Sequence, residues 1–144
     1  MTFVRTRFAP MIASALLGFA ALAAPAPAFA DPVAPVASEW ANPKNSVHIR
    51  AEQCGRNLCG VVTWASDKAQ ADARRGGTTN LVGTTIFRDL KPTGGNSWRG
   101  KVYVPDINQT FAGTLTFNGN NTMEGKGCVL FGLVCKTQTW TRIK

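Results

Sequence analysis

Beyond about residue 40, apolar and polar residues alternate with a period of two, the pattern of half-buried β-strands. In the stretch TFAGTLTF (110–117), one face of an extended chain would carry Phe111, Gly113, Leu115 and Phe117. VHIRA (47–51) and WRGKVYV (98–104) alternate in the same way. Clusters of glycine, asparagine and proline, such as KPTGGNS and NGNN, separate these stretches and predict turns. The pattern therefore predicts an all-β chain of seven or eight short antiparallel strands.

Helical patterning is weak in the same region. The stretch ASDKAQADARRGG (65–77) has the propensity for a short helix but shows no apolar face, so we expect a long exposed loop or a single frayed turn. One-sided strands with so little helix favour a small up-and-down barrel, closed or half open, because such a barrel leaves few strand edges unpaired.

The first 30 residues have the composition of a cleavable signal peptide. Arg5 and Arg7 form a basic start, and an unbroken apolar run follows at 11–24. The segment ends in AFA (28–30), the small-x-small pattern that signal peptidase cuts. The apolar run is shorter than the roughly 20 residues that a membrane-spanning helix needs, although an uncleaved anchor is the alternative. We expect cleavage after Ala30 and a periplasmic or secreted protein without a membrane span.

The predicted cut divides the chain into a signal peptide (1–30), a flexible linker and one folded domain. Residues 31–38, DPVAPVAS, combine two prolines with small side chains, which is typical of an extended linker. Residues 39–144 are enough for one domain, the β-barrel, and too few for two. The full chain carries a formal net charge of +8, which suits an anionic partner and equally suits simple solubility.

The four cysteines form two close pairs in the sequence: Cys54 with Cys59, and Cys128 with Cys135. Each spacing is odd, the parity of facing residues in a hairpin, and the two bends would centre on Arg56-Asn57 and Phe131-Gly132. Facing residues lie within the separation that a disulfide spans, and an oxidising compartment favours such bonds. We therefore expect two local disulfides, with crossed pairing and free or metal-bound thiols as the alternatives. Zinc-type and CxxC redox spacings are absent from the sequence.

Three blocks of sequence carry a family resemblance: IRAEQCGRNLCGVVTW, GNSWRGKVYVPDINQTFAGTLTF and GKGCVLFGLVCKTQTWTR. Over about residues 39–144 the chain resembles the bacterial exported proteins grouped as domain of unknown function 2147. The resemblance implies a small lipocalin-like β-barrel and no established activity. The chain departs from the family at Glu39-Trp40, where a glycine usually precedes the tryptophan, and at VPDINQTF, where an Asp-Pro turn is usually followed by glycine.

Tryptophans and one arginine are the candidate residues for barrel closure or binding. Trp98 lies on an apolar strand face, so we expect it in the core, whereas the face of Trp140 is less typical of a core. The lipocalin resemblance implies that an arginine near the C-terminus stacks on an N-terminal tryptophan, and Arg142 and Trp40 hold suitable positions. We therefore assign Trp40, Trp140 and Arg142 to barrel closure, with ligand contact as the alternative.

Residue types that would support catalysis are sparse. The single histidine, His48, falls on a strand face with polar neighbours, so we expect a solvent-exposed side chain without partners. The acidic residues form no close pair in the sequence, and serine-elbow, Walker and dinucleotide glycine motifs are absent from it. The sequence therefore predicts that the protein is not an enzyme and that it holds no metal or cofactor.

These features predict a non-catalytic, exported barrel that binds a small apolar ligand or an anionic component of the cell envelope. The alternative is a purely structural or stress-linked envelope interaction protein, whose barrel is filled by side chains and holds no ligand. An apolar cavity inside the barrel would discriminate between the two. We expect no nucleic acid as a partner of an exported chain.

Overall fold

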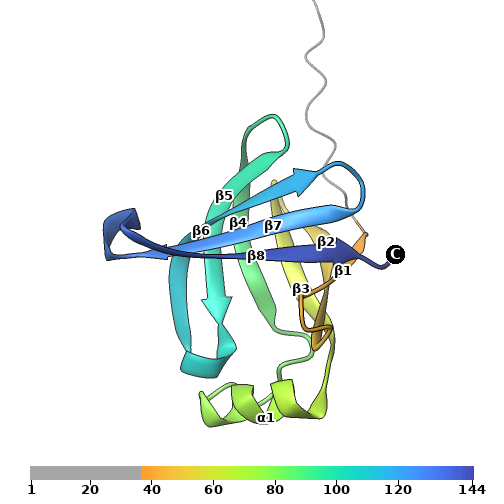
Figure 1. Ribbon diagram of the computed structural model, residues 1–144, viewed down its shortest axis with the longest axis vertical. Helices are drawn as coiled ribbons and strands as arrows, with labels where there is room; N and C mark the ends of the chain where they lie inside the picture. Colours follow the sequence, from red (N-terminus) through yellow and green to blue (C-terminus); the bar gives the residue numbers. More distant parts are fainter. Residues whose placement is uncertain (1–36) are drawn as a thin grey trace, which may run out of the picture.

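The computed structural model describes residues 37–144, which form a closed antiparallel barrel of eight strands in sequence order (Figure 1). The strands are β1 (Glu39–Ala41), β2 (Val47–Cys54), β3 (Asn57–Ala65), β4 (Thr85–Gly94), β5 (Ser97–Val104), β6 (Gln109–Asn118), β7 (Thr122–Val129) and β8 (Val134–Arg142). The connections within these residues contain the helix α1 (Asp67–Arg75) and the 3-10 turns η1 (Pro105–Ile107) and η2 (Leu130–Gly132). The predicted all-β up-and-down barrel is confirmed.

The N-terminal predictions fall mostly on residues that the structure does not describe. The predicted signal peptide (1–30) and linker residues 31–36 lie outside the described range. The last two residues of the predicted linker belong to the fold. The amide of Ala37 donates to the carbonyl of Ala51 (2.7 Å), and Ser38 is 1% exposed.

The alternation within β6 carries over directly into the barrel. Gly113, Leu115 and Phe117 are buried, whereas the residues between them remain partly accessible. Phe117 packs against Trp40 and Trp98, with ring centroids 5.4 and 5.0 Å away. Such aromatic pairs contribute about 0.5–1.5 kcal/mol each beyond the area that they bury. This aromatic cluster fills one end of the barrel, and the predicted core position of Trp98 is confirmed.

The barrel closes over a short seam between β1 and β8. The two strands share two register pairs, one of which is Trp40 with Arg142. Beyond this ladder, the amide of Ile143 donates to the carbonyl of Glu39 (2.8 Å), and the amide of Glu39 donates to the carbonyl of Lys144 (3.0 Å). Because β1 has only three residues, the rest of β8 extends past it, and this edge of β8 pairs with no other strand of residues 37–144.

The side chain of Glu39 reinforces this seam. Its carboxylate accepts a hydrogen bond from Arg50 of β2 (2.6 Å) and lies 3.5 Å from Nζ of Lys144. The hydrogen bond from Arg50 holds the pKa of Glu39 below its ordinary value of 4.5, although burial acts in the opposite direction. Glu39 thereby links β1 both to β2 and to the residues that follow β8.

The expectation of a loop or frayed turn at 65–77 is wrong, because nine of these residues form α1. The Oγ atom of Ser66 accepts a hydrogen bond from the amide of Ala69 (3.2 Å) and caps the N-terminus of the helix. Ala73 is fully buried. The apolar face of α1 is therefore real but narrow, since alanines supply it.

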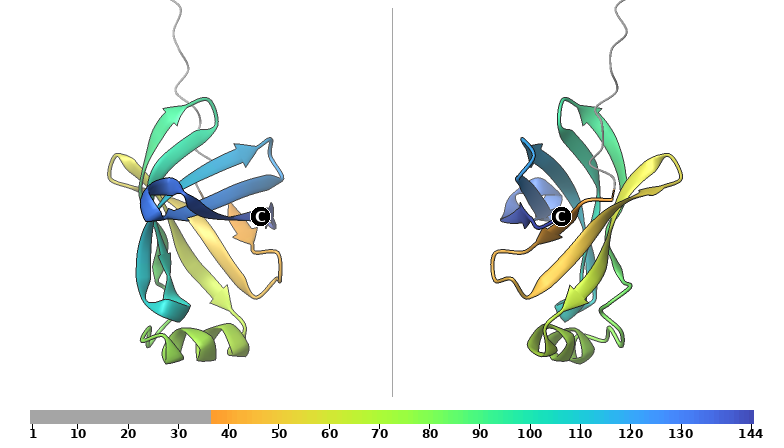
Figure 2. Two further views of the ribbon diagram at one scale, coloured as in Figure 1. Left: turned by 60° about the vertical axis from the view of Figure 1, so that its left-hand side comes forward. Right: turned by 90° about the vertical axis from the view of Figure 1, so that its right-hand side faces the viewer.

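The helix α1 covers the end of the barrel opposite the aromatic cluster and packs beside η1 (Figure 2). Gly76, just after the helix, permits this approach, because a Cβ atom there would lie 2.3 Å from backbone atoms of Asp106. The departure from the family pattern at VPDINQTF coincides with η1, and Asn108 ends this turn with a left-handed φ of 50°.

Both predicted disulfides are present: Cys54 bonds to Cys59, and Cys128 bonds to Cys135. In the β7–β8 hairpin the two cysteines are direct register partners, with Cα atoms 4.0 Å apart. In the β2–β3 hairpin the bend centres on Gly55-Arg56, so Cys54 faces Asn57 and its disulfide runs diagonally. The predicted pairing is correct, but the predicted centre of the β2–β3 bend, Arg56-Asn57, is wrong by one residue.

Candidate functional site

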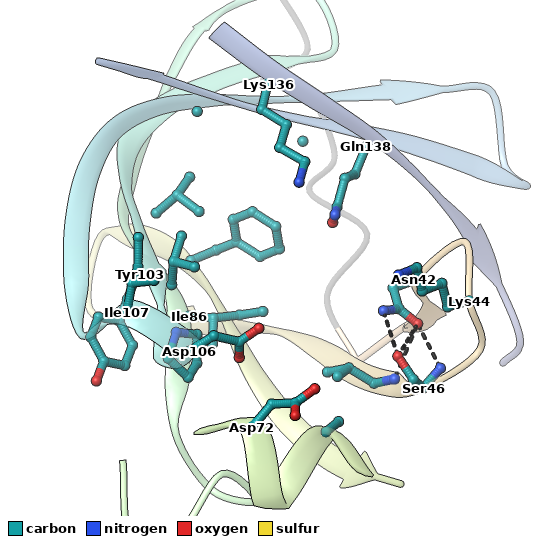
Figure 3. Close-up of a pocket in the computed structure, with 18 of the residues that line it drawn as sticks. Asn42, Lys44, Ser46, Asp72, Ile86, Tyr103, Asp106, Ile107, Lys136 and Gln138 are labelled. Carbon is teal, nitrogen blue, oxygen red and sulfur yellow. Dashed lines mark hydrogen bonds between the residues drawn. The ribbon is translucent and has the colours of Figure 1, made fainter. Parts of the chain in front are cut away.

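A cavity of about 900 Å³ occupies the half of the barrel nearest α1 (Figure 3). Residues from β4 to β8 line it, together with residues of α1, η1 and the connection between β1 and β2 (42–46). Since the aromatic cluster fills the other half, the cavity is the unfilled part of the barrel interior. It borders the edge of β8 that extends past β1.

Two glycines of β7 leave part of the inner wall without side chains. Gly125 and Gly127 line the cavity and alternate with Lys126, which is exposed. A Cβ atom at Gly125 would lie 3.2 Å from the ring of Phe87, so this glycine gives the ring room. A Cβ atom at Gly127 would meet no heavy atom within 4 Å. The cavity therefore reaches the backbone of β7 at Gly127.

Apolar side chains form much of the remaining wall. They include Ile86, Phe87, Val102, Phe111 and Trp140. The ring of Trp140 meets the ring of Phe87 edge to face, with centroids 5.8 Å apart. Removal of such surface from water by an apolar ligand would contribute roughly 25 cal/mol per Å². The wall is therefore suited to the apolar part of a small molecule.

Lysines lie where the cavity meets β8 and the β1–β2 connection. Lys136 and Gln138 extend from β8 into the cavity, and Lys44 lies across from them (Figure 3). Within residues 37–144, neither Lys44 nor Lys136 forms an ion pair. Both lysines are exposed, so water and salt partly screen their attraction for an anion.

Of the two acidic residues of the wall, Asp72 is paired within its own helix, and Asp106 is not. Asp72 of α1 pairs with Lys68 (2.8 Å) and with Arg75 on the same helix. The hydrogen bond from Lys68 is the main cause that lowers the pKa of Asp72. Asp72 is therefore ionised, but its charge is balanced by neighbours on α1. Asp106, the other acidic residue of the wall, forms no ion pair within residues 37–144 and leaves one negative charge beside the two lysines.

Asn42 holds the β1–β2 connection in place beside the cavity. Its side-chain oxygen accepts hydrogen bonds from the amides of Ser46 (2.7 Å) and Val47 (3.1 Å). Its side-chain nitrogen donates to Oγ of Ser46 (3.0 Å), as the dashed lines of Figure 3 show for the pair Asn42 and Ser46. These bonds fix the short connection that carries Lys44.

Of the three predicted closure or binding residues, Trp140 lines the cavity. Its polar neighbours on β8 made a core position unexpected, yet Trp140 is 4% exposed. Trp40 instead lies in the aromatic cluster, where its indole Nε1 donates to Oγ of Ser38 (2.8 Å). The structure therefore separates the two tryptophans into the filled and the unfilled halves of the barrel.

The predicted stacking of Arg142 on Trp40 is wrong. The guanidinium group of Arg142 donates to the carbonyl oxygens of Lys144 (2.9 Å) and Asn120 (3.4 Å). Within residues 37–144, the cation–π contact is that of Arg88 over the ring of Tyr103, at 4.4 Å from the centroid. Trp40 is fully buried and Arg142 is exposed, so closure rests on backbone pairing and on Glu39.

His48 has partners, contrary to the prediction. Its Nε2 lies 2.7 Å from Oδ1 of Asn45, and its ring packs against Trp64 with centroids 4.6 Å apart. Neither ring lines the cavity. Within the described residues, no group of three or more His, Cys, Asp or Glu side chains is placed to hold a metal ion. A helix long and apolar enough to cross a membrane is likewise absent from residues 37–144.

The residues that shape the cavity were missed by the sequence analysis. Gly127 is the register partner of Lys136, so the bare part of the wall and an unpaired cation lie side by side on β7 and β8. A signal was present in the stretch GKG (125–127), because alternate glycines on one strand face leave that face of a barrel without side chains.

Comparison with solved structures supports the fold. The chain is similar to the protein HP1028 from the human pathogen Helicobacter pylori, which is described as belonging to the lipocalin family. The two chains are 16% identical, the match covers 76% of this chain and 83% of that chain, and the TM-score is 0.59. At this identity the likeness establishes a lipocalin-like barrel and nothing about a ligand. A comparison with curated proteins gives no match.

Comparison with protein families covers the same region. Residues 38–142, which include all eight strands, match the family described as "Uncharacterized protein conserved in bacteria (DUF2147)". The match extends over well more than half of the chain, in agreement with the resemblance carried by its three sequence blocks. The chain therefore belongs to this bacterial family of lipocalin-like barrels.

Proposed function

We propose that the protein binds, in its barrel cavity, a small molecule with an apolar body and an anionic group, and that it does so without catalysis. The observation that carries this proposal is the cavity of about 900 Å³, with its apolar wall and Lys136 beside it. Small-molecule sites measure roughly 300–1,000 Å³ and combine apolar walls with a few well-placed polar groups. The cavity has both properties.

The charges around the cavity support an anionic group in the ligand. Lys44 and Lys136 have no ion-pair partner within residues 37–144, whereas Asp72 is already paired. A ligand could place its apolar body over the bare backbone at Gly127 and its carboxylate or phosphate near Lys136. A cationic ligand would instead be repelled by these two lysines, and the single unpaired carboxylate of the wall, Asp106, would offset this repulsion only in part.

Structural roles of the polar groups in the wall support binding without catalysis. Cys135 is held in a disulfide, Ser66 caps α1, and Asp72 is engaged by lysine and arginine on its own helix. His48 lies away from the cavity, beside Trp64. The other hydroxyl groups of the lining are also hydrogen-bonded within the fold, Ser46 to Asn42 and Tyr103 to Thr78 and Asn108.

We place this activity outside the cytoplasm, in the periplasm or in the medium. Two disulfides within one small domain are typical of proteins from an oxidising compartment. Residues 1–30 also have the composition of a signal peptide. The intact mass of protein recovered from its host tests this location, because cleavage after Ala30 predicts the mass of residues 31–144.

A purely structural barrel filled by side chains is the competing function. It would require side chains to occupy the barrel interior at both ends. The open space over Gly127 and the cavity below the aromatic cluster do not favour it.

Titration with matched amphiphiles tests the proposed ligand class. Dodecanoate, dodecanol and dodecyltrimethylammonium, kept below their critical micelle concentrations, share an apolar chain and differ in head-group charge. Tryptophan fluorescence reports on Trp140 in the cavity wall. We expect dodecanoate to bind roughly tenfold or more tightly than the other two, because Lys136 and Lys44 favour its carboxylate.

Two variants locate the preference within the protein. Lys136→Gln should remove most of the selectivity for dodecanoate, whereas Lys126→Gln, on the outer face of β7, should retain it. Equal affinity for all three amphiphiles would contradict the anionic group in the proposal. The absence of saturable binding for every probe would contradict ligand binding itself.

A further inference from the structure

The tip of the β7–β8 hairpin exposes a contiguous group of apolar side chains. The exposed fractions are 64% for Leu130, 108% for Phe131, 84% for Leu133 and 54% for Val134. Single apolar residues on a protein surface are ordinary, whereas a contiguous exposed group marks an interaction site. These four residues are called the apolar tip below.

The backbone and a disulfide hold the apolar tip in its exposed conformation. Leu130 and Phe131 have φ angles of 51° and 56°, a region that bulky apolar residues rarely adopt. The Cys128–Cys135 disulfide closes the hairpin just below them, and the amide of Leu133 donates to the carbonyl of Leu130 (3.1 Å). The cross-linked hairpin therefore presents these side chains to solvent in an uncommon backbone geometry.

The apolar tip projects beyond the sheet. The ladder between β6 and β7 ends at the pair Ala112 and Cys128, and the rest of β6 pairs only with β5. Past Cys128 the hairpin has no neighbouring strand among residues 37–144, and it stands out from the barrel on the side away from the C-terminus (Figures 1 and 2). Val134 also lines the cavity, so the apolar tip lies next to the cavity border.

Cations surround the base of the apolar tip. Lys126 precedes Cys128 by two residues, and Lys101 lies in the same register row as Cys128, because both pair with Ala112. Both are exposed, and within residues 37–144 neither forms an ion pair. A convex apolar tip with a cationic base is complementary to an anionic membrane, whose head groups attract lysine and whose acyl chains accept apolar side chains.

We propose that the apolar tip inserts into the surface of a membrane that contains anionic phospholipids, while the lysines at its base contact the head groups. Four side chains on a narrow convex hairpin cannot supply the roughly 800 Å² that each partner buries in a stable protein–protein interface. A deformable lipid surface has no such requirement. This inference goes beyond the proposed ligand binding and does not depend on it.

Sedimentation with vesicles tests the proposal on the processed protein as its host produces it. We expect the protein to bind vesicles of phosphatidylglycerol and phosphatidylcholine mixed one to two, and to bind pure phosphatidylcholine only weakly. Phe131→Ser combined with Leu133→Ser should weaken binding to the anionic vesicles roughly tenfold or more, because two apolar side chains no longer enter the acyl region. Added salt should also weaken the binding of the wild-type protein.

The matched control is Val82→Ser, since Val82 is 47% exposed but lies outside the apolar tip. It should bind vesicles like the wild-type protein. Thermal unfolding and retained dodecanoate binding would show that the double variant is folded and that its cavity is intact. The proposal is overturned if the wild-type protein ignores anionic vesicles, or if the double variant binds them equally well. If the wild-type protein forms dimers without lipid and the double variant is monomeric, the apolar tip binds a second copy of the chain, and the membrane proposal is overturned as well.

Discussion

Trp40 and Arg142 are register partners across the β1–β8 seam, and their side chains reach different groups. The indole of Trp40 donates to Ser38 inside the barrel, while the guanidinium of Arg142 donates to backbone carbonyl oxygens on the surface. Backbone pairing and the Glu39 carboxylate therefore join the two ends of the barrel. Trp40 acts separately, as a core residue.

This separation predicts unequal and nearly independent effects of mutation. Trp40→Ala should cost about 3–5 kcal/mol of unfolding free energy, because it empties a fully buried site. Arg142→Ala should cost about 1 kcal/mol, the contribution of a partly solvated hydrogen bond. Urea unfolding of both variants and of the double variant measures the coupling, which we expect to stay under about 0.5 kcal/mol. A coupling energy well above 1 kcal/mol would instead indicate a direct contact between the two side chains.

Glu39 should make the stability of the barrel depend on pH. Glu39→Gln should cost about 1–2 kcal/mol at neutral pH, in the lower part of the range for charged hydrogen bonds, because Arg50 is 45% exposed. Since folding lowers the pKa of Glu39, its contribution is present above pH 4.5 and is lost as the pH falls through the folded-state pKa. Urea unfolding across this pH range should show that the unfolding free energies of the wild-type protein and Glu39→Gln converge in acid.

The control for this series is Glu52→Gln, at a carboxylate without an ion pair within residues 37–144. It should change stability by less than about 0.5 kcal/mol at every pH. A Glu39→Gln penalty that persists undiminished in acid would argue against the ionised carboxylate as the stabilising group.

The barrel was predictable because the alternation that produces its strands is visible within short stretches of sequence. Alternation in residues 110–117 places Leu115 and Phe117 on one face, and this pattern survives in the fold unchanged. The helix α1 was not predictable in the same way, because its buried face consists of alanine. Ala73 is buried, and the helix packs beside η1 through the close approach of Gly76 to Asp106, a contact between distant parts of the chain.

The N-cap of α1 should be measurable. Ser66→Ala removes the acceptor for the amide of Ala69 and should cost about 1 kcal/mol of unfolding free energy. Thr79→Ala, at an exposed position after the helix, should stay within about 0.5 kcal/mol of the wild-type protein. Equal effects of the two substitutions in thermal or urea unfolding would mean that the cap contributes nothing.

Each disulfide should contribute to stability by closing a short loop. The chain-entropy estimate for loops as short as Cys54–Cys59 and Cys128–Cys135 is about 2–2.5 kcal/mol apiece. Replacing either pair with serines should lower the unfolding free energy by that amount. Peptide mapping without reductant checks the pairing, and a peptide of Cys54 bonded to Cys128 or Cys135 would refute it.

The cavity could not be predicted, because its shape depends on how several strands align and no single stretch of sequence shows that. Trp140 has polar neighbours on its strand face because Lys136 and Gln138 border an open cavity, and only the register of β7 with β8 shows this. Gly127 resembles any glycine at a bend in a barrel. Its role follows from the empty space above its Cα atom, which depends on every strand that faces it.

The central claim is that a ligand occupies the space over Gly127. Gly127→Trp would fill part of this space, and the substitution is compatible with the fold because a Cβ atom meets nothing within 4 Å and the backbone is not left-handed. Thr137→Trp adds the same side chain on the exposed face of β8 and serves as the control. Thermal unfolding would establish that both variants are folded.

Isothermal titration with dodecanoate then compares the three proteins directly. The account predicts that Gly127→Trp weakens binding roughly tenfold or more, since it removes the volume and apolar contacts that the ligand uses, while Thr137→Trp binds like the wild-type protein. Wild-type affinity in a folded Gly127→Trp protein would contradict the claim, because it would place the ligand outside the barrel cavity.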